Sequence, residues 1–169
     1  MGERWTHPYP SGVYRFWVFV HLVGVTGFLL THGVSMWAMF AVRAVDRDRE
    51  RILDRCETSK ATTLPMYISF GLLLLGGVAA GIDGALFAQG WLLGSLALLL
   101  ALATSMSMVA TPHMKRLREG CTRWADGSYT MSDEELGEAL AAPATVITAA
   151  SGSIGLLAIV ALMVFKPGS

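Results

Sequence analysis

The chain has 169 residues, of which 53% are hydrophobic and 15% are charged, and its mean hydropathy is +0.51. This composition excludes an ordinary soluble globule, and the formal net charge of zero gives no support for a nucleic-acid partner. The charges gather between long uncharged stretches. An integral membrane protein needs this pattern, because a charge exposed to lipid costs several kcal/mol.

Four apolar stretches predict membrane-spanning helices, because each holds about 20 residues or more and alternating β-barrel patterning is absent. The predicted fold class is therefore all-α: one domain, a polytopic four-transmembrane-helix bundle in the lipid bilayer. The second and third spans are joined by a very short link, so they form an antiparallel hairpin. The predicted spans are residues 16–42, 64–87, 91–110 and 145–165.

Lysine and arginine are divided unequally between the two sides of the membrane. The two long connections carry ten of them, and only Arg4, Arg15 and Lys166 lie on the other side. The positive-inside rule then places both termini outside and both long loops in the cytoplasm, in a multi-pass protein of the cell membrane.

Both long loops contain signals for local helices. Residues 46–60 have interleaved charges and few helix breakers, so they either continue the first span or form a short surface helix. In the second loop, Ser132 followed by Glu135 is a capping-box pattern that predicts a short helix through Leu140.

Two histidines lie inside the first span and are the only chemical signal that stands above background. His21 and His32 are 11 residues apart, so they share one helix face at an axial separation of about 16 Å. Ionisable groups at membrane depth are costly and mark functional sites by default. Met36 and Met39 share this face, which suits a flat apolar cofactor or a soft metal but equally suits plain helix packing.

Depth matching gives His32 a partner on the third span. Counted from the charged boundary, His32 lies at about 16 Å and Met106 at about 13 Å. This match favours a His–Met haem, a five-coordinate haem or a His32–His32 site across a dimer, because His113 is too shallow for an intrachain bis-histidine haem. A proton relay is another interpretation. The structural alternative is an imidazole bonded to a hydroxyl of Thr104, Ser105, Ser107, Ser151 or Ser153.

The same counting places His21 near Asp83, at the outer end of the second span. A hydrogen bond or ion pair between them would satisfy two costly groups. It would act either as a structural clasp or as the carboxylate that orients a metal-bound imidazole. A zinc site from Cys56, Cys121 and His113 lacks any local ligand spacing.

Small-residue patterns predict close helix packing within the bundle or between subunits, which leaves a homo-oligomer or a larger membrane complex open. Walker A, nucleophile-elbow and HExxH motifs are missing, as are paired carboxylates inside a span. We therefore expect no stand-alone catalytic activity. The small-residue patterns are Gly77-x-x-x-Gly81, Ser151-x-x-x-Gly155 and the pair Gly24 and Gly27.

The segment FVHLVGVTGFLLTHGVSMWAMFAVR, with the basic segment and glycine-rich span after it, resembles a family of uncharacterised small four-helix integral membrane proteins. That family looks related to the copper-resistance protein D domain and, more remotely, to the HemJ-type protoporphyrinogen oxidases. The resemblance covers mainly residues 16–85 and implies a four-helix bundle with a haem b or copper role. His21 best matches the first-span histidine of the related families. His32–Gly33 replace the apolar–aromatic–Pro-Arg sequence of the oxidases, so oxidase activity is not implied.

Two hypotheses of different class follow. In the first, the protein binds haem b, with copper as the second choice, through His32 assisted by Met106 or His21, and serves electron transfer or redox sensing. In the second, it is a cofactor-free subunit of a membrane complex that packs through its glycine and serine faces.

Overall fold

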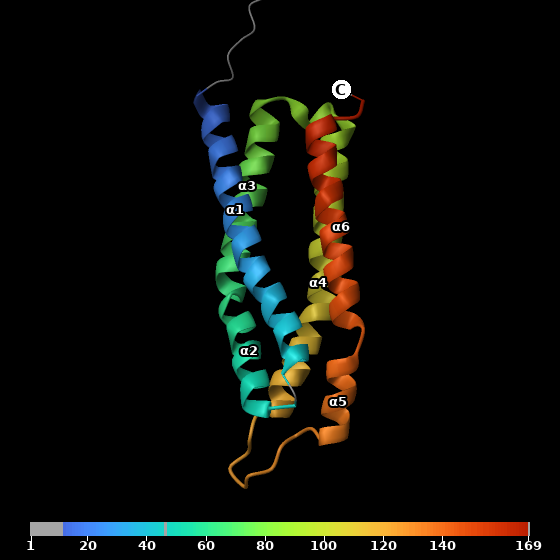
Figure 1. Cartoon of the computed structure of the whole chain (residues 1–169). Helices are drawn as coiled ribbons and strands as arrows, with labels where there is room; N and C mark the ends of the chain where they lie inside the picture. The colour runs from blue at the N-terminus through green and yellow to red at the C-terminus, as the bar shows by residue number, and fades with distance from the viewer. Residues whose placement is uncertain (1–11, 46, 169) are drawn as a thin grey trace, which may run out of the picture.

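The structure, a computed structural model, describes residues 12–45 and 47–168, whose regular structure is entirely helical (Figure 1). Among these residues, four helices are long and apolar enough to cross a membrane, which confirms the predicted all-α membrane bundle. The helices are α1 (Gly12–Ala41), α2 (Arg49–Ala61), α3 (Thr63–Asp83), α4 (Gly90–Cys121), α5 (Asp133–Ala141) and α6 (Ala144–Phe165), with 3-10 turns η1 (Val42–Ala44) and η2 (Leu86–Ala88).

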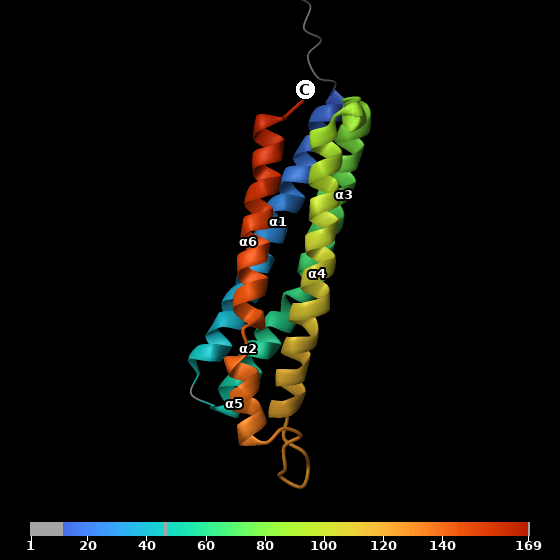
Figure 2. The same ribbon diagram turned by 90° about the vertical axis from the view of Figure 1, so that its right-hand side faces the viewer.

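The helices form two pairs that run side by side. α1 lies along α2 and α3, and α4 lies along α6, as Figures 1 and 2 show from two directions. Gly12 and the C-terminal segment lie at one end of the bundle. The opposite end, which we call the loop end, carries η1, α2, α5 and the connection of residues 122–132.

Two helix boundaries differ from the predicted spans. α3 stops at Asp83, where Ala85 takes a left-handed conformation and leads into η2. α4 continues through Pro112 to Cys121, well past the predicted end at Ala110. Hydropathy marks where apolar residues stop, whereas a helix continues as long as its backbone remains hydrogen-bonded and favourable pairs support it.

The charged segment after the first span forms a separate helix. Asp48 caps α2 by accepting hydrogen bonds from the N–H groups of Glu50 and Arg51. Thr62 alone separates α2 from α3, so the two make one long rod beside α1. In the second loop, the predicted capping box of Ser132 is confirmed at the start of α5.

Glycines bring the backbones of α1 and α3 into direct contact. Gly24 faces the backbone of Leu72 and Leu73, and Gly76 faces the backbone of His21. A Cβ atom on either glycine would collide with main-chain atoms that have nowhere to move. Small residues permit this close approach in membranes, where the hydrophobic effect does not drive helices together. The contact therefore fixes the register of α1 against α3.

The other predicted small-residue patterns also pack inside the bundle. Gly77 lies against the ring of His21, and Gly81 lies against Phe87. Gly155 of α6 is covered by the side chain of Leu102 from α4. These contacts assign the patterns to packing within one chain.

The two helix pairs are joined mainly at the loop end, where η1, α2, α4 and α5 share an apolar core. The large apolar side chains exposed on the long helices, such as Phe19, Leu30 and Ile154, face the surroundings, as lipid-facing residues do. The core at the loop end consists of Val42, Ile52, Cys56, Leu117, Cys121, Met131, Leu136 and Ala139.

The glycine contact makes a direct prediction. Gly76→Ala adds a methyl group against the His21 backbone, and such overpacking costs about 1–3 kcal/mol. Gly71→Ala is the matched control on the same helix, because a Cβ there meets nothing within 4 Å. In detergent, circular dichroism is expected to show a lower melting temperature for Gly76→Ala and an unchanged or higher one for Gly71→Ala. Equal melting of the two variants would show that α1 and α3 do not touch there.

Candidate functional site

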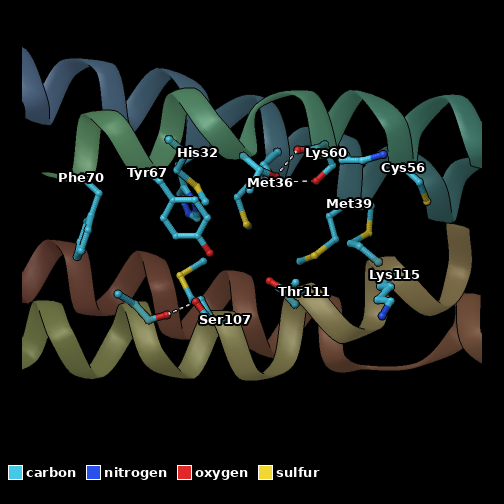
Figure 3. Close-up of a pocket in the computed structure, with 18 of the residues that line it drawn as sticks. His32, Met36, Met39, Cys56, Lys60, Tyr67, Phe70, Ser107, Thr111 and Lys115 are labelled. Atoms are coloured by element: carbon cyan, nitrogen blue, oxygen red, sulfur yellow. Dashed lines mark hydrogen bonds between the residues drawn. The ribbon is translucent and has the colours of Figure 1, made fainter.

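A pocket of about 380 Å³ lies between α1, α2 and α3 on one side and α4 on the other (Figure 3). Its volume is within the range of about 300–1,000 Å³ that is usual for small-molecule sites. The lining residues from α1 to α3 are Phe28, His32, Ser35, Met36, Met39, Cys56, Ser59, Lys60, Thr63, Met66, Tyr67 and Phe70, and those from α4 are Ala103, Met106, Ser107, Ala110, Thr111, Met114, Lys115 and Arg118.

The structure brings four of the predicted cofactor residues into this one pocket. His32, Met36 and Met39 approach from α1, and Met106 approaches from α4. His32 and Met106, which depth counting paired, thus line the same pocket. The thioether of Met106 also lies against α6, where a Cβ built on Gly152 would be 3.6 Å from its sulfur.

The imidazole of His32 is held by a ring contact. It stacks on Phe28 with centroids 5.4 Å apart and an interplanar angle of 4°, and Phe28 in turn lies 5.8 Å from Phe70. Within the described part of the chain, neither ring nitrogen of His32 makes a hydrogen bond. The ring is therefore oriented by packing, and its nitrogens remain open to a ligand in the pocket.

The hydroxyls proposed as partners of His32 are used elsewhere. Thr104 and Ser107 donate to the carbonyls of Leu100 and Ala103 at 2.8 Å, within their own helix. Ser105 and Ser151 likewise bond to carbonyls one turn back. For these four residues the structural alternative is wrong, because a hydroxyl in a lipid-facing helix finds its nearest acceptor on that helix.

His21 does not share this pocket. Its Nδ1 lies 2.8 Å from the carbonyl oxygen of Leu73, and its ring packs on Gly77. It lines a separate small cavity of about 50 Å³ with Ile159 and Met163 of α6. Both histidines point into the protein, but they line two different cavities.

The predicted pairing of His21 with Asp83 is wrong for Nδ1, which uses the Leu73 carbonyl instead. The α1 residue that packs against the C-terminal end of α3 is Tyr14. Its ring lies 3.0 Å from a Cβ atom built on Gly84, the residue after Asp83. Tyr14 is two turns from His21, about 10 Å along the axis. The counting failed because α2 and α3 form one rod that begins at Arg49, so depth on α3 must be counted from there and not from the start of the apolar span.

Sequence reasoning missed the part of the pocket that α2 and the end of α4 contribute. Cys56 and Lys60 come from α2, and Met114, Lys115 and Arg118 come from the continuation of α4. These residues were assigned to loops. The helical spacing of Lys115 and Arg118, three apart, was the signal that would have placed both on one face.

The charges around the pocket are asymmetric. Lys60, Lys115 and Arg118 line it at the loop end, and no acidic residue lines it. Figure 3 shows Phe70 and His32 towards one end and Lys60 and Lys115 towards the other. The pocket thus changes from apolar and aromatic to cationic along its length.

Cys56, Cys121 and His113, which lack the ligand spacing of a zinc site in the sequence, do not form one in the structure. Over the described residues, no group of three or more His, Cys, Asp or Glu side chains is placed to hold a metal ion. Cys56 and Cys121 are free thiols buried in the core at the loop end, where both behave as small apolar residues.

No protein-family model, curated protein or solved structure matches the chain. The interpretation of the pocket therefore rests on its own residues.

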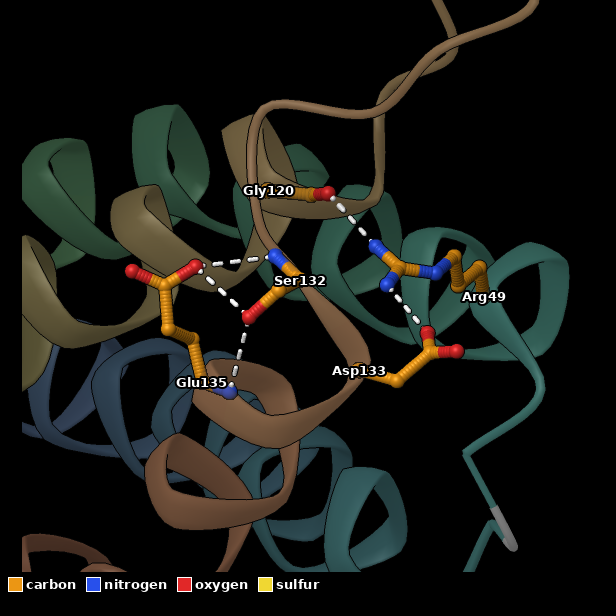
Figure 4. A network of polar contacts seen from close by, with 5 residues as sticks. All are labelled: Arg49, Gly120, Ser132, Asp133 and Glu135. Carbon is orange, nitrogen blue, oxygen red and sulfur yellow. Dashed lines mark hydrogen bonds and ion pairs between the residues drawn. The ribbon is translucent and has the colours of Figure 1, made fainter.

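At the loop end, Arg49 joins three segments of the chain (Figure 4). Its guanidinium donates to the carbonyl of Gly120 at 3.0 Å and to Asp133, and lies 4.4 Å above the ring of Tyr129. One side chain thus links α2 to the end of α4 and to the start of α5. The Arg49 side chain is 11% exposed, and its bond to Gly120 is partly buried, whereas the Asp133 carboxylate at the other bond is 84% exposed.

Arg49→Met keeps the apolar stem and removes these contacts, with an expected loss of about 1–3 kcal/mol in the free energy of unfolding. Arg51→Met is the control, because the Arg51 side chain is 73% exposed and pairs only with Asp48 at the surface. Denaturant unfolding in detergent measures both variants. Equal stability would show that the Arg49 links contribute nothing.

Proposed function

We propose that the protein binds haem b in the pocket between α1 and α4, with His32 as the axial ligand, and serves electron transfer or redox sensing. The observation that carries this proposal is the half-buried imidazole of His32, which faces the pocket and makes no hydrogen bond within the described residues. An imidazole held by stacking, with its nitrogens open to an apolar cavity, is suited to bind a metal centre.

The residues around His32 fit a flat apolar group. Phe28 fixes the plane of the imidazole, and Phe70 and Ala103 add apolar surface. Met106 offers a thioether from the facing helix, so a His–Met pair or a single histidine ligand is available. A bound haem supplies one-electron chemistry. The protein would exclude water from it and tune its potential through the identity of the second ligand.

We further propose that both termini face the outside and that both long loops lie in the cytoplasm. The support is the ten-to-three division of lysine and arginine together with the shared end of Gly12 and the C-terminal segment. In this orientation, the basic end of the pocket opens towards the cytoplasm.

The haem proposal is tested by the absorption spectrum of detergent-purified protein supplied with haem. The wild type is expected to show a Soret band that His32→Ala abolishes, because the axial nitrogen is lost. Met106→Leu is expected to keep the band and shift the iron from six to five ligands. His21→Gln is the control, because His21 lies outside the pocket. A wild type that stays colourless, or a band unchanged in His32→Ala, would refute the proposal.

A second candidate is a copper(I) site. Five of the nine methionines of the chain line the same pocket, together with Cys56. Thioether sulfurs are soft donors that select copper(I) over the harder divalent metals. The five methionines are Met36, Met39, Met66, Met106 and Met114.

Methionine-to-leucine changes test the copper candidate, because they remove the sulfur and nearly conserve volume. Met36→Leu combined with Met39→Leu is expected to weaken copper(I) binding about tenfold or more, measured by competition with a chromophoric chelator. Met108→Leu is the control, because Met108 is 74% exposed and lies outside the pocket. Equal affinity in all variants would remove copper and leave the methionines as apolar filling.

A further inference from the structure

We infer that the pocket selects an amphiphile whose apolar body lies beside His32 and whose carboxylate or phosphate lies against Lys60, Lys115 and Arg118. Haem b, an apolar disc with two carboxylates, belongs to this class, so the inference deepens the proposed function. It rests on the same pocket, but it requires neither a metal nor the imidazole of His32. A fatty acid or a lysophospholipid acid from the membrane has the same chemistry.

The first support is the absence of acidic residues from the pocket wall. The three cations are its only charged lining residues among those described. Lys60 and Lys115 lie towards one end in Figure 3, and Arg118 contacts the same Glu57 carboxylate as Lys60. An uncharged apolar ligand would gain nothing from them. Their acidic partners, Glu57 for Lys60 and Arg118 and Glu119 for Lys115, do not line the pocket. Cations on an apolar, low-dielectric wall attract the opposite charge.

The second support is a carboxylate outside the pocket that contacts two of the three cations. One carboxylate oxygen of Glu57 lies 3.5 Å from the Nζ of Lys60, and the other lies 3.7 Å from the Arg118 guanidinium. Glu57 itself does not line the pocket. Lys60 from α2 and Arg118 from α4 are therefore spaced to hold one carboxylate between two helices. The exposed pair with Lys60 contributes little, so a ligand anion can compete with Glu57.

The third support is the length of the part that precedes the cations. The lining residues of α4 before Lys115 run from Ala103 to Met114, which is about 16 Å at 1.5 Å per residue. Along this distance methionine, alanine and aromatic side chains alternate with serine and threonine hydroxyls, and the ring of Tyr67 projects from α3 towards α4 (Figure 3). Methionine side chains adapt to irregular apolar ligands. An elongated chain or disc with one charged end matches this gradient.

The test uses the full chain in nanodiscs of zwitterionic lipid, with a fluorescent polyene fatty acid and its methyl ester as probes. The acid is expected to bind at least tenfold more tightly than the ester. The combined variant Lys60→Gln, Lys115→Gln and Arg118→Gln is expected to remove this difference by weakening only the acid. Lys115→Gln alone, at a side chain that is 64% exposed, tests the same effect where the triple variant does not fold.

The matched control removes three exposed arginines outside the pocket, Arg43→Gln, Arg51→Gln and Arg123→Gln, and so changes the net charge equally. It is expected to leave the preference for the acid intact. Competition with lysophosphatidate or unlabelled fatty acid shows whether the anion is a phosphate or a carboxylate. Equal binding of acid and ester by the wild type, or an equal effect of both triple variants, would overturn the inference.

The same samples separate this inference from the haem proposal. His32→Ala is expected to abolish the Soret band while retaining the preference for the acid, because His32 lies away from the cationic end. A preference for the acid in a protein that binds no haem would refute the proposed function alone. A Soret band without any charge preference would refute the inference alone.

Discussion

The backbones of α1 and α3 meet at Gly24 and Gly76, and the placement of the other α1 side chains depends on this contact. Lipid is as apolar as the helices, so close approach of small residues, and not the hydrophobic effect, selects how two helices pair in a membrane. With the register fixed here, His21 packs on α3, and its Nδ1 lies beside the Leu73 carbonyl oxygen. His32, three turns further along, then faces across the bundle towards α4.

The pocket exists because the two helix pairs are tied together at one end more than along their length. The apolar core and Arg49 join η1, α2, α4 and α5 at the loop end. Between that core and the glycine contact, the facing walls are built from methionines and small residues such as Ala103 and Ala110, which leave room unfilled. The two tight contacts hold the helices apart in the region between them, so a cavity remains there without further packing.

The chemistry of the pocket combines soft donors with positive charge. The imidazole of His32 and the thioether groups lie beside apolar side chains such as Phe28, Phe70 and Ala103. Lysine and arginine lie where the helices leave the apolar region, and their long stems reach into it while the charged groups stay near water. The two sets of side chains lie in different parts of the pocket, so variants can change one set without the other.

The sequence by itself determined the properties that depend on local periodicity and composition. It predicted the four apolar helices and the cap of α5 at Ser132. Only the tertiary structure decided which residues meet across helices. It gave His21 the carbonyl of Leu73 as its partner, and it brought Lys60 of α2 together with Arg118 of α4. Hydropathy counts depth from a charged boundary, whereas the register between helices is set by where their backbones touch and where the chain turns.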